Sequence, residues 1–171
     1  KSTVARALAA ELNLPHFDTG AMYRAVAGAA FRQELEFSDA SAIAELAKTA
    51  EISIGEKIIV DGVDATDEIR SAEVNQLVSV VAANREVRRI LVPLQRQWAT
   101  ELGGGVMEGR DIGTQVFPDA VFKVFLTADL PIRAERRFRE TEGQTFEDVL
   151  KDLQRRDHVD STRDDSPLEV A

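Results

Sequence analysis

The sequence predicts an α/β fold in which helices flank a parallel sheet, and three observations indicate it. A helical pattern over residues 2–12 precedes the short apolar run LPHFDTG, and a second helical pattern follows that run to about Gln33. The same alternation returns after residue 102, where glycines precede the apolar run VMEG. Strands that alternate with helices are typical of parallel sheets covered by helices.

The first elements are predicted by spacing and by capping residues. Apolar side chains recur every fourth position at Val4, Leu8 and Leu12, and the NLP that follows ends the pattern. LPHFDTG then predicts a buried strand with polar side chains at its carboxyl end. Asp18 or Thr19 caps the next helix.

Residues 38–101 differ in pattern from the segments on either side. SDASAIAELAKTA predicts a capped helix, and ISIGEKIIVDGVDATDEIR predicts an antiparallel meander that turns at Asp61-Gly62. Two further helices are predicted from Ser71 and Asn84. We interpret this stretch as an insertion into the main sheet.

The α/β pattern resumes with VMEG, and AVFKVFLTAD is the most strand-like run in the chain. Helices are predicted near 131–142 and 145–157. The prediction is a single domain over 1–171, made of a core at 1–37 and 102–130, an insertion at about 38–101 and a helical region at about 131–165.

Composition excludes several classes of protein. No apolar run is long enough to span a membrane, and the absence of Cys excludes a disulfide framework, so the cytoplasm is the expected location. Thirty acidic residues against 21 basic ones give a net charge of −9, which disfavours polymeric nucleic acid as a partner. Arginine dominates the basic residues, which suits local phosphate sites, although codon bias in a high-GC genome explains it equally well.

Lys1-Ser2-Thr3 precedes a helix and matches the last three residues of a G-x-x-x-x-G-K-[ST] phosphate-binding loop. In such a loop backbone amides cradle phosphates, the Lys neutralises them, and the next hydroxyl ligates Mg²⁺. The glycines of the loop are not in this sequence. By itself, therefore, the tripeptide is more simply explained as a Ser/Thr helix cap.

DTGAMYR places a hydroxyl, a ring and a guanidinium within one helical turn, at Thr19, Tyr23 and Arg24. These groups could converge on a small anionic ligand. The alternative is an ordinary capped helix with Arg24 in solvent.

VMEGRDIG places Glu108, Arg110 and Asp111 at the end of a strand, where open α/β sheets bind ligands. Glu108 resembles the acidic residue that holds Mg²⁺ after a Walker B strand, Arg110 could bind a phosphate, and Asp111 could accept hydrogen bonds from an amine. A surface turn is the alternative, and it is less attractive because two acids and an Arg are costly to bury without a role.

Arginines gather in two further places, which together could form a lid over a triphosphate. Either cluster alone is explained as a solvated helix face. His16 has no partner at metal-ligand spacing and is interpreted as a core or surface histidine. The clusters comprise Arg133, Arg136 and Arg137, and Arg155, Arg156 and Arg163 with Asp157 and Asp160.

Taken together, KST…FDTGAMYRAVA, DEIRSAEVNQLVSVVAANREVRRIL, MEGRDIGTQVFPDAVFKVFLTA and RRDHVDSTRDDSPL resemble the bacterial cytidylate kinases, which are P-loop nucleoside monophosphate kinases. The resemblance covers nearly the whole chain, and GRDIGTxVFPDA is its most specific phrase. It implies a P-loop kinase-type parallel sheet core flanked by helices, with an inserted monophosphate-binding subdomain and a short helical lid. It also implies a monomer that transfers a phosphoryl group from ATP to CMP or dCMP with Mg²⁺.

The resemblance assigns a role to each matching residue. It implies that ATP is held by Lys1, Ser2 and Thr3, and Mg²⁺ by Ser2 and Glu108. It implies that the phosphate of CMP is bound by Arg24, Arg110 and Arg163, its ribose by Thr19, Arg156 and Asp160, and its cytosine by Ser79, Arg88 and Asp111. It implies that the catalytic residues are Lys1, Arg110, Arg163 and the lid arginines Arg133 and Arg137.

The sequence departs from this family at both ends. The family begins with an apolar strand and a complete glycine loop and continues beyond SPL, so we expect the 171 residues to be part of a longer gene product. Two alternatives stay open. One is another P-loop kinase for UMP/CMP, AMP or shikimate, against which the long insertion argues. The other is a non-catalytic nucleotide-binding fragment, which the missing glycine loop favours.

Overall fold

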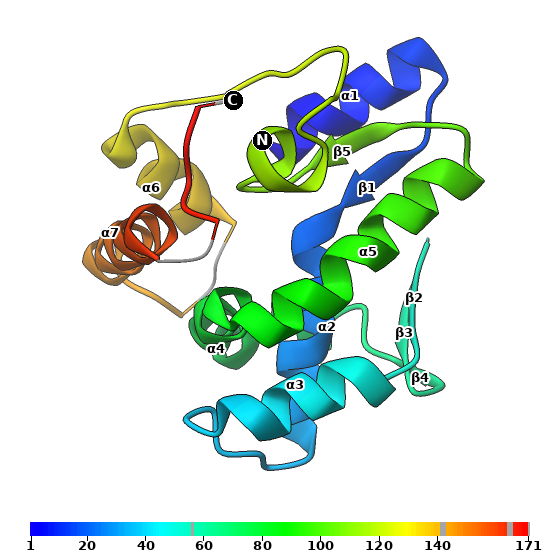
Figure 1. Ribbon diagram of the computed structural model, residues 1–171. Coiled ribbons are helices and arrows are strands. Elements are labelled where there is room, and N and C mark those ends of the chain that lie inside the picture. The colour runs from blue at the N-terminus through cyan, green and yellow to red at the C-terminus, as the bar shows by residue number, and fades with distance from the viewer. Residues whose placement is uncertain (56, 141–142, 164–165, 171) are drawn as a thin grey trace.

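The computed structural model describes residues 1–55, 57–140, 143–163 and 166–170 (Figure 1). Helices and two small sheets alternate along the chain. The elements are α1 (Ser2–Leu12), β1 (His16–Asp18), α2 (Thr19–Arg32), α3 (Ala40–Thr49), β2 (Ile52–Ile54), β3 (Ile58–Val60), β4 (Val63–Asp64), η1 (Glu68–Arg70), α4 (Ala72–Ala83), α5 (Arg85–Glu101), β5 (Val106–Glu108), η2 (Ile112–Val116), α6 (Leu130–Arg139) and α7 (Phe146–Thr162).

β1 and β5 form a parallel pair, which confirms the predicted α/β class. The two strands lie side by side although almost ninety positions separate them in the sequence, and Asp18 stands opposite Glu108. Their carboxyl ends therefore deliver acidic side chains to one edge of the sheet. This is the edge at which open α/β sheets bind ligands.

The predicted meander is present as the antiparallel sheet β2-β3-β4. Asp61 and Gly62 connect β3 to β4 with φ angles of 52° and 78°. Two successive residues with positive φ suit a two-residue hairpin whose twist matches that of the strands. The expected turn at Asp61-Gly62 is therefore confirmed.

The ion pair beside β4 gives a pH prediction. The hydrogen bond from Lys57, at 2.7 Å, is the main cause that lowers the pKa of Asp64 to about 2, and Thr66 adds to it. Because the folded state favours the ionised carboxylate, this stabilisation is full above the unfolded pKa of about 3.9 and is lost as the pH falls toward 2. We expect Lys57→Met to raise the pKa of Asp64 in a carboxyl NMR titration, and Lys48→Met to leave it unchanged. An unaltered titration in Lys57→Met would contradict this.

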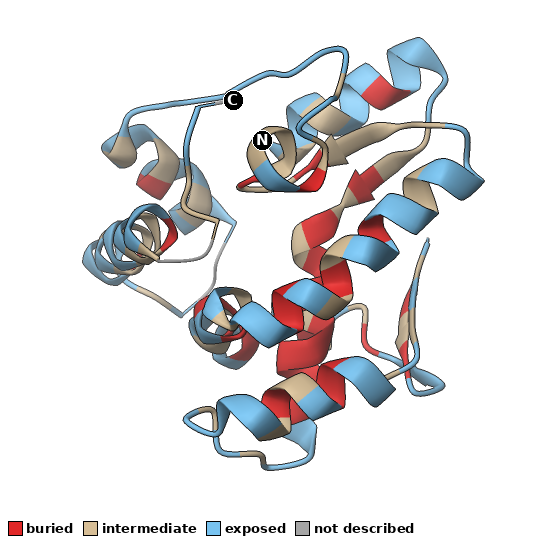
Figure 2. Ribbon diagram, in the orientation of Figure 1, coloured by how far each residue is buried: buried red, intermediate tan, exposed pale blue. Residues whose placement is uncertain are grey.

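The core is built around α2, in which ten of fourteen residues are buried (Figure 2). Seven of its fourteen residues are glycine or alanine, so neighbouring helices and η1 approach its axis closely. Around α2 pack α3, α4 and η1. This packing fixes the first turn of α2 against the carboxyl end of the sheet.

The run predicted to be the best strand, 120–129, is not a strand. It passes from η2 to α6 across the top of the molecule and does not lie beside β5 (Figure 1). Val121, Phe122 and Val124 are exposed. A strand needs a neighbour to accept its backbone hydrogen bonds, and no described strand lies beside this segment. The prediction was wrong because a run of residues with high β-propensity forms a strand only where a neighbouring strand packs and pairs with it.

α6 and α7 pack against each other, and α7 also packs against α4. α7 continues past its predicted end at 157 to Thr162, which keeps Asp157 and Asp160 on one helix; the predicted end of α6 at 142 lies outside the described residues. Whether this pair moves as a lid, and whether 38–101 is a subdomain, stay predictions.

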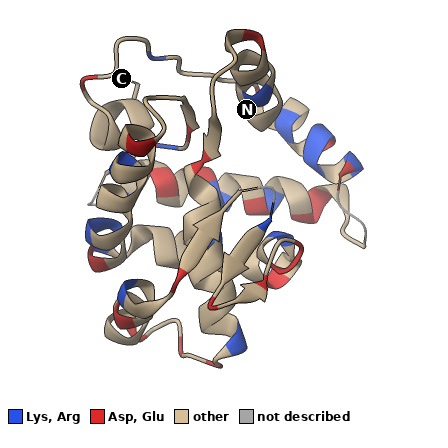
Figure 3. Cartoon of the chain, turned by 90° about the vertical axis from the view of Figure 1, so that its right-hand side faces the viewer, with Lys and Arg blue, Asp and Glu red and all other residues tan. Residues whose placement is uncertain are grey.

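Charged residues of both signs are spread over the helices of the described chain (Figure 3). No helix among the described residues is long and apolar enough to cross a membrane. The expectation that no polymeric nucleic acid binds stays a prediction.

Candidate active site

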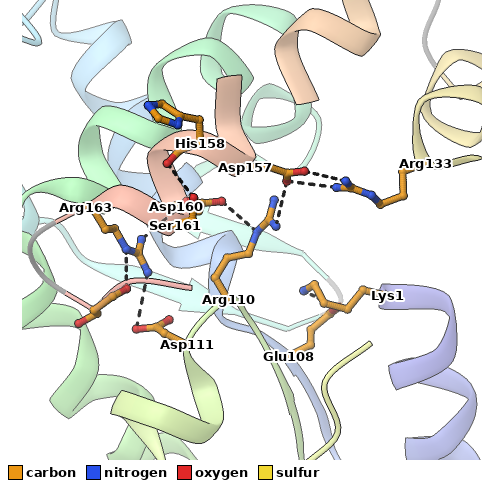
Figure 4. A network of polar contacts seen from close by, with 11 residues as sticks. Lys1, Glu108, Arg110, Asp111, Arg133, Asp157, His158, Asp160, Ser161 and Arg163 are labelled. Atoms are coloured by element: carbon orange, nitrogen blue, oxygen red, sulfur yellow. Dashed lines mark hydrogen bonds and ion pairs between the residues drawn. The ribbon is translucent and has the colours of Figure 1, made fainter. Parts of the chain in front are cut away.

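Glu108 ends β5 and is 4% exposed. Its Oε2 accepts a hydrogen bond from Lys1 Nζ at 2.7 Å (Figure 4) and another from Ser2 Oγ at 3.0 Å. A buried carboxylate needs such partners to keep its charge. The structure thus joins the N-terminus of α1, through Lys1 and Ser2, to the acidic residue for which the resemblance implied a role in binding Mg²⁺.

His16 lies on the other side of the same carboxylate, with Nε2 3.1 Å from Glu108 Oε1. The sequence interpretation of His16 as a core or surface histidine missed this contact. A signal was present, because alternation along a strand puts His16 on the same face as Asp18, whose opposite residue is Glu108. It could be used only once β1 and β5 were known to pair.

Thr19 joins α2 to the end of β5. Its Oγ1 donates to the carbonyl of Glu108 at 2.9 Å, and the side chain is buried. A Cβ added at Gly109 would stand 2.5 Å from that Oγ1, so only glycine permits this approach. The hydroxyl hydrogen of Thr19 is therefore used in a hydrogen bond within the protein, while the hydroxyl oxygen can still accept a hydrogen bond.

Arg24 reaches back to the start of its own helix. It donates to Asp18 Oδ2 at 2.5 Å, and the other oxygen of Asp18 accepts from the Gly20 N–H at 3.0 Å. The helix is capped, as one interpretation expected, but Arg24 is held at the edge of the sheet and not in solvent. Its side chain is 20% exposed there.

Arg88 and Asp111 form a buried ion pair between α5 and the loop after β5. Arg88 is 4% exposed and Asp111 7% exposed, and Arg88 also lies 3.4 Å from the hydroxyl of Tyr23. Ser79, on α4, is likewise buried. A buried pair that still offers carboxylate and guanidinium edges is suited to polar recognition.

Tyr23 is the only tyrosine in the chain and reports on this pair. Burial raises the pKa of its phenol, and Arg88 opposes the rise. Because the folded state favours the neutral phenol, that stabilisation is present below pH about 10 and is lost as the pH rises through the raised pKa. We expect Arg88→Met to raise the pKa of Tyr23 further, measured as phenolate absorbance, and Arg89→Met to leave it unchanged. A lower pKa in Arg88→Met would contradict the prediction.

Arg110 connects the core to the helical pair. Its Nε lies 3.2 Å from Asp160 and its NH1 group 3.7 Å from Asp157, both on α7. Asp157 also accepts two hydrogen bonds from Arg133 of α6, at 2.6 and 3.1 Å (Figure 4). Two arginines from distant elements therefore converge on one carboxylate.

Arg163 and Arg156 carry positive charge in buried surroundings. The Arg163 side chain is 6% exposed and lies 3.9 Å from Asp111 and 3.8 Å from Asp160. Burial, and after it Arg88, lowers the pKa of Arg163; burial, and after it Arg110, lowers the pKa of Arg156. Positive charges brought so close together favour a bound anion.

The family is decided by comparison with known proteins. A model of the family described as cytidylate kinase matches residues 1–171. The chain belongs to the cytidylate kinase family. It is 46% identical to a cytidylate kinase of Caldanaerobacter subterraneus subsp. tengcongensis over 99% of this chain and 78% of that one, and 42% identical to a cytidylate kinase of Bacillus subtilis over 100% and 80%. A cytidylate kinase of Rhodococcus opacus is 46% identical over 100% and 79%. The stated resemblance is confirmed.

Two residues to which the cytidylate kinase resemblance gives a role take no part in the contacts at Glu108, Asp111 and Asp157 described above. Thr3 is exposed in the first turn of α1. Arg137, on α6, is close enough to Arg156 for its charge to lower the pKa of that guanidinium. Lys1, Ser2 and Thr19 contact Glu108, whereas Arg88 and Arg163 lie against Asp111.

The donors around Glu108 suit Mg²⁺ in a cytidylate kinase. A carboxylate and a hydroxyl, Glu108 and Ser2, meet at 3.0 Å, and oxygen atoms are the ligands that Mg²⁺ takes. The described residues contain no cluster of three or more acidic, His or Cys side chains that would cage a metal alone. The donor set fits an ion that also binds substrate phosphates.

Proposed function

We propose that the protein transfers the γ-phosphoryl group of ATP to CMP or dCMP, giving ADP and CDP or dCDP, as a cytoplasmic monomer. The observation that carries the proposal is one arrangement at the sheet edge. The Asp111 carboxylate, paired with the buried Arg88, lies beside Arg163. Arg110 and the ion pair of Glu108 with Lys1 lie in the same region (Figure 4). This arrangement supports adjacent sites for the cytosine base, for the phosphate of CMP and for the phosphates of ATP.

Cytosine recognition follows from donors and acceptors. Asp111 and Ser79 accept from the exocyclic amine, and Arg88 donates to the ring nitrogen and the carbonyl oxygen. Uracil presents an acceptor where cytosine has its amine, so Asp111 would face an acceptor in place of a donor, at a cost of about 1–3 kcal/mol. The protein is therefore expected to prefer CMP to UMP.

The phosphate of CMP is proposed to bind Arg24, Arg110 and Arg163, and the ribose to contact Thr19, Arg156 and Asp160. These arginines are held by Asp18, Asp157 or Asp160. A phosphate exchanges those carboxylate contacts for stronger ones to a more highly charged anion. The guanidiniums are thus positioned before the ligand arrives.

In the transfer step an oxygen of the CMP phosphate attacks the γ-phosphorus of ATP, and the bond from that phosphorus to the β–γ bridging oxygen breaks. Lys1, Arg110, Arg133, Arg137 and Arg163 neutralise charge on the transferred group. Mg²⁺ at Ser2 and Glu108 would supply further neutralisation of the ATP phosphates. No residue forms a covalent intermediate, so catalysis rests on positioning.

The test is ADP release with ATP and one of CMP, dCMP, UMP, AMP or shikimate, with and without Mg²⁺. Turnover of CMP or dCMP well above the other acceptors supports the proposal. Turnover of AMP or shikimate without CMP would favour another P-loop kinase. Calorimetric binding of CMP without turnover would favour a non-catalytic nucleotide-binding protein.

A further inference from the structure

Arg96 lies on α5, eight residues after Arg88, and contacts the same loop as that residue. Its Nε donates to the Val116 carbonyl at 2.7 Å, and its NH2 group donates to the Gln115 carbonyl at 2.8 Å. Within the described chain Arg96 forms no ion pair with a carboxylate. Its charged donors are directed at backbone carbonyls, and the planar guanidinium fork suits two such acceptors at once.

The two carbonyls are connected to Asp111 through the backbone of η2. The N–H groups of Gln115 and Val116 donate to the Asp111 carbonyl at 2.9 and 3.3 Å. The Gln115 carbonyl and the Val116 N–H belong to one peptide group, so a donor on the carbonyl polarises the N–H that holds Asp111. A continuous series of hydrogen bonds therefore runs from Arg96 to Asp111.

α5 thus holds the 111–116 turn at both ends. Arg88 contacts the Asp111 carboxylate, and Arg96, roughly 12 Å further along the helix axis, holds the far end. The turn is a single π-type turn, a rare geometry that often occurs at functional sites. A turn of this kind depends on outside contacts for its shape.

We propose that Arg96 is a positioning residue that sets the orientation of Asp111 and thereby the selectivity of the enzyme for cytosine. This inference rests on the proposed function, because it gives Arg96 a part in base recognition. Arg96 does not touch the nucleotide. It acts through the backbone of Gln115 and Val116.

The kinetic experiment compares Arg96→Met and Arg96→Lys with Arg89→Met, an exposed arginine on the same helix that pairs only locally with Glu86. In Arg96→Met we expect KM for CMP to rise about tenfold and the CMP-over-UMP ratio of kcat/KM to fall about tenfold, with KM for ATP within about twofold. The KM for CMP and the CMP-over-UMP ratio of Arg96→Lys should lie between those of Arg96→Met and the unsubstituted protein, since Lys lacks the fork that reaches both carbonyls. Arg89→Met should match the unsubstituted protein.

A second measurement does not depend on activity. Hydrogen exchange of the Gln115 and Val116 amides should be about tenfold faster in Arg96→Met, while amides of α3 are unchanged. Unchanged exchange at these two amides in Arg96→Met would overturn the proposal. A kcat/KM that falls equally for CMP, UMP and ATP would overturn it as well. If the unsubstituted protein does not turn over CMP, the proposed function fails, and the exchange result still decides whether Arg96 holds the turn.

Discussion

Arg88→Met is expected to lower kcat/KM for CMP by about 10²–10³-fold. The substitution removes one partner of a buried ion pair and leaves the buried Asp111 carboxylate with Arg163, 3.9 Å away, as its remaining cationic neighbour. Breaking a buried pair in this way costs about 3–5 kcal/mol. Because Arg88 and Asp111 are proposed to bind cytosine, the loss should appear in KM for CMP, and KM for ATP should change by less than about threefold.

Arg89→Met is the matched control for this measurement. Arg89 is the next residue on α5, its side chain is 70% exposed, and it pairs with Glu86 one turn earlier. Exposed pairs of this kind contribute about 0–1 kcal/mol, so its kinetics should match those of the unsubstituted protein. If Arg88→Met lowered kcat/KM equally for CMP and ATP and also lowered the melting temperature, Arg88 would contribute to folding and not to recognition of the base.

Glu108→Gln is expected to lower kcat by about 10²–10³-fold at saturating Mg²⁺. Glutamine has nearly the same shape and still accepts a hydrogen bond from Ser2, so the fold should survive. The negative charge that faces Lys1 Nζ at 2.7 Å is lost, and with it the carboxylate proposed to bind Mg²⁺. The affinity for CMP alone, measured by calorimetry, should stay within about threefold.

Glu101→Gln provides the control for Glu108→Gln, because Glu101 is exposed at the end of α5 and contacts only the neighbouring Gln97 among the hydrogen bonds of the described chain. It should leave kcat unchanged. If Glu108→Gln retained full kcat with an unchanged dependence on Mg²⁺, the assignment of Glu108 to the metal would be wrong.

The elements that the sequence predicted correctly depend on neighbours close in the chain. The helices α1, α2 and α5 follow from spacing and capping residues, and the turn at Asp61-Gly62 follows from backbone preference. The 120–129 run failed by the same reasoning, because its apolar pattern describes a strand only if another strand accepts its hydrogen bonds. Local signals predict where an element can form, and sheets need a second segment as well.

The candidate site divides in a similar way. Glu108, Arg110 and Asp111 could be singled out because they follow a predicted strand. His16 and Arg96 could not, since His16 meets Glu108 across 92 positions and Arg96 meets Val116 through backbone carbonyls that carry no residue-specific signal. Contacts to backbone leave almost no trace in a single sequence.

By itself the sequence determined the α/β class and the family resemblance and predicted the residues of a phosphate site, because spacing, capping and the phrase GRDIGTQVFPDA are local properties of the chain. Only the tertiary structure decided which groups meet. Lys1 reaches Glu108 across 107 positions, and Arg88 buries its charge against Asp111. Such contacts are set by the packing of α2 and α5 against the sheet, where burial makes each unpaired charge costly and so selects the pairs that form.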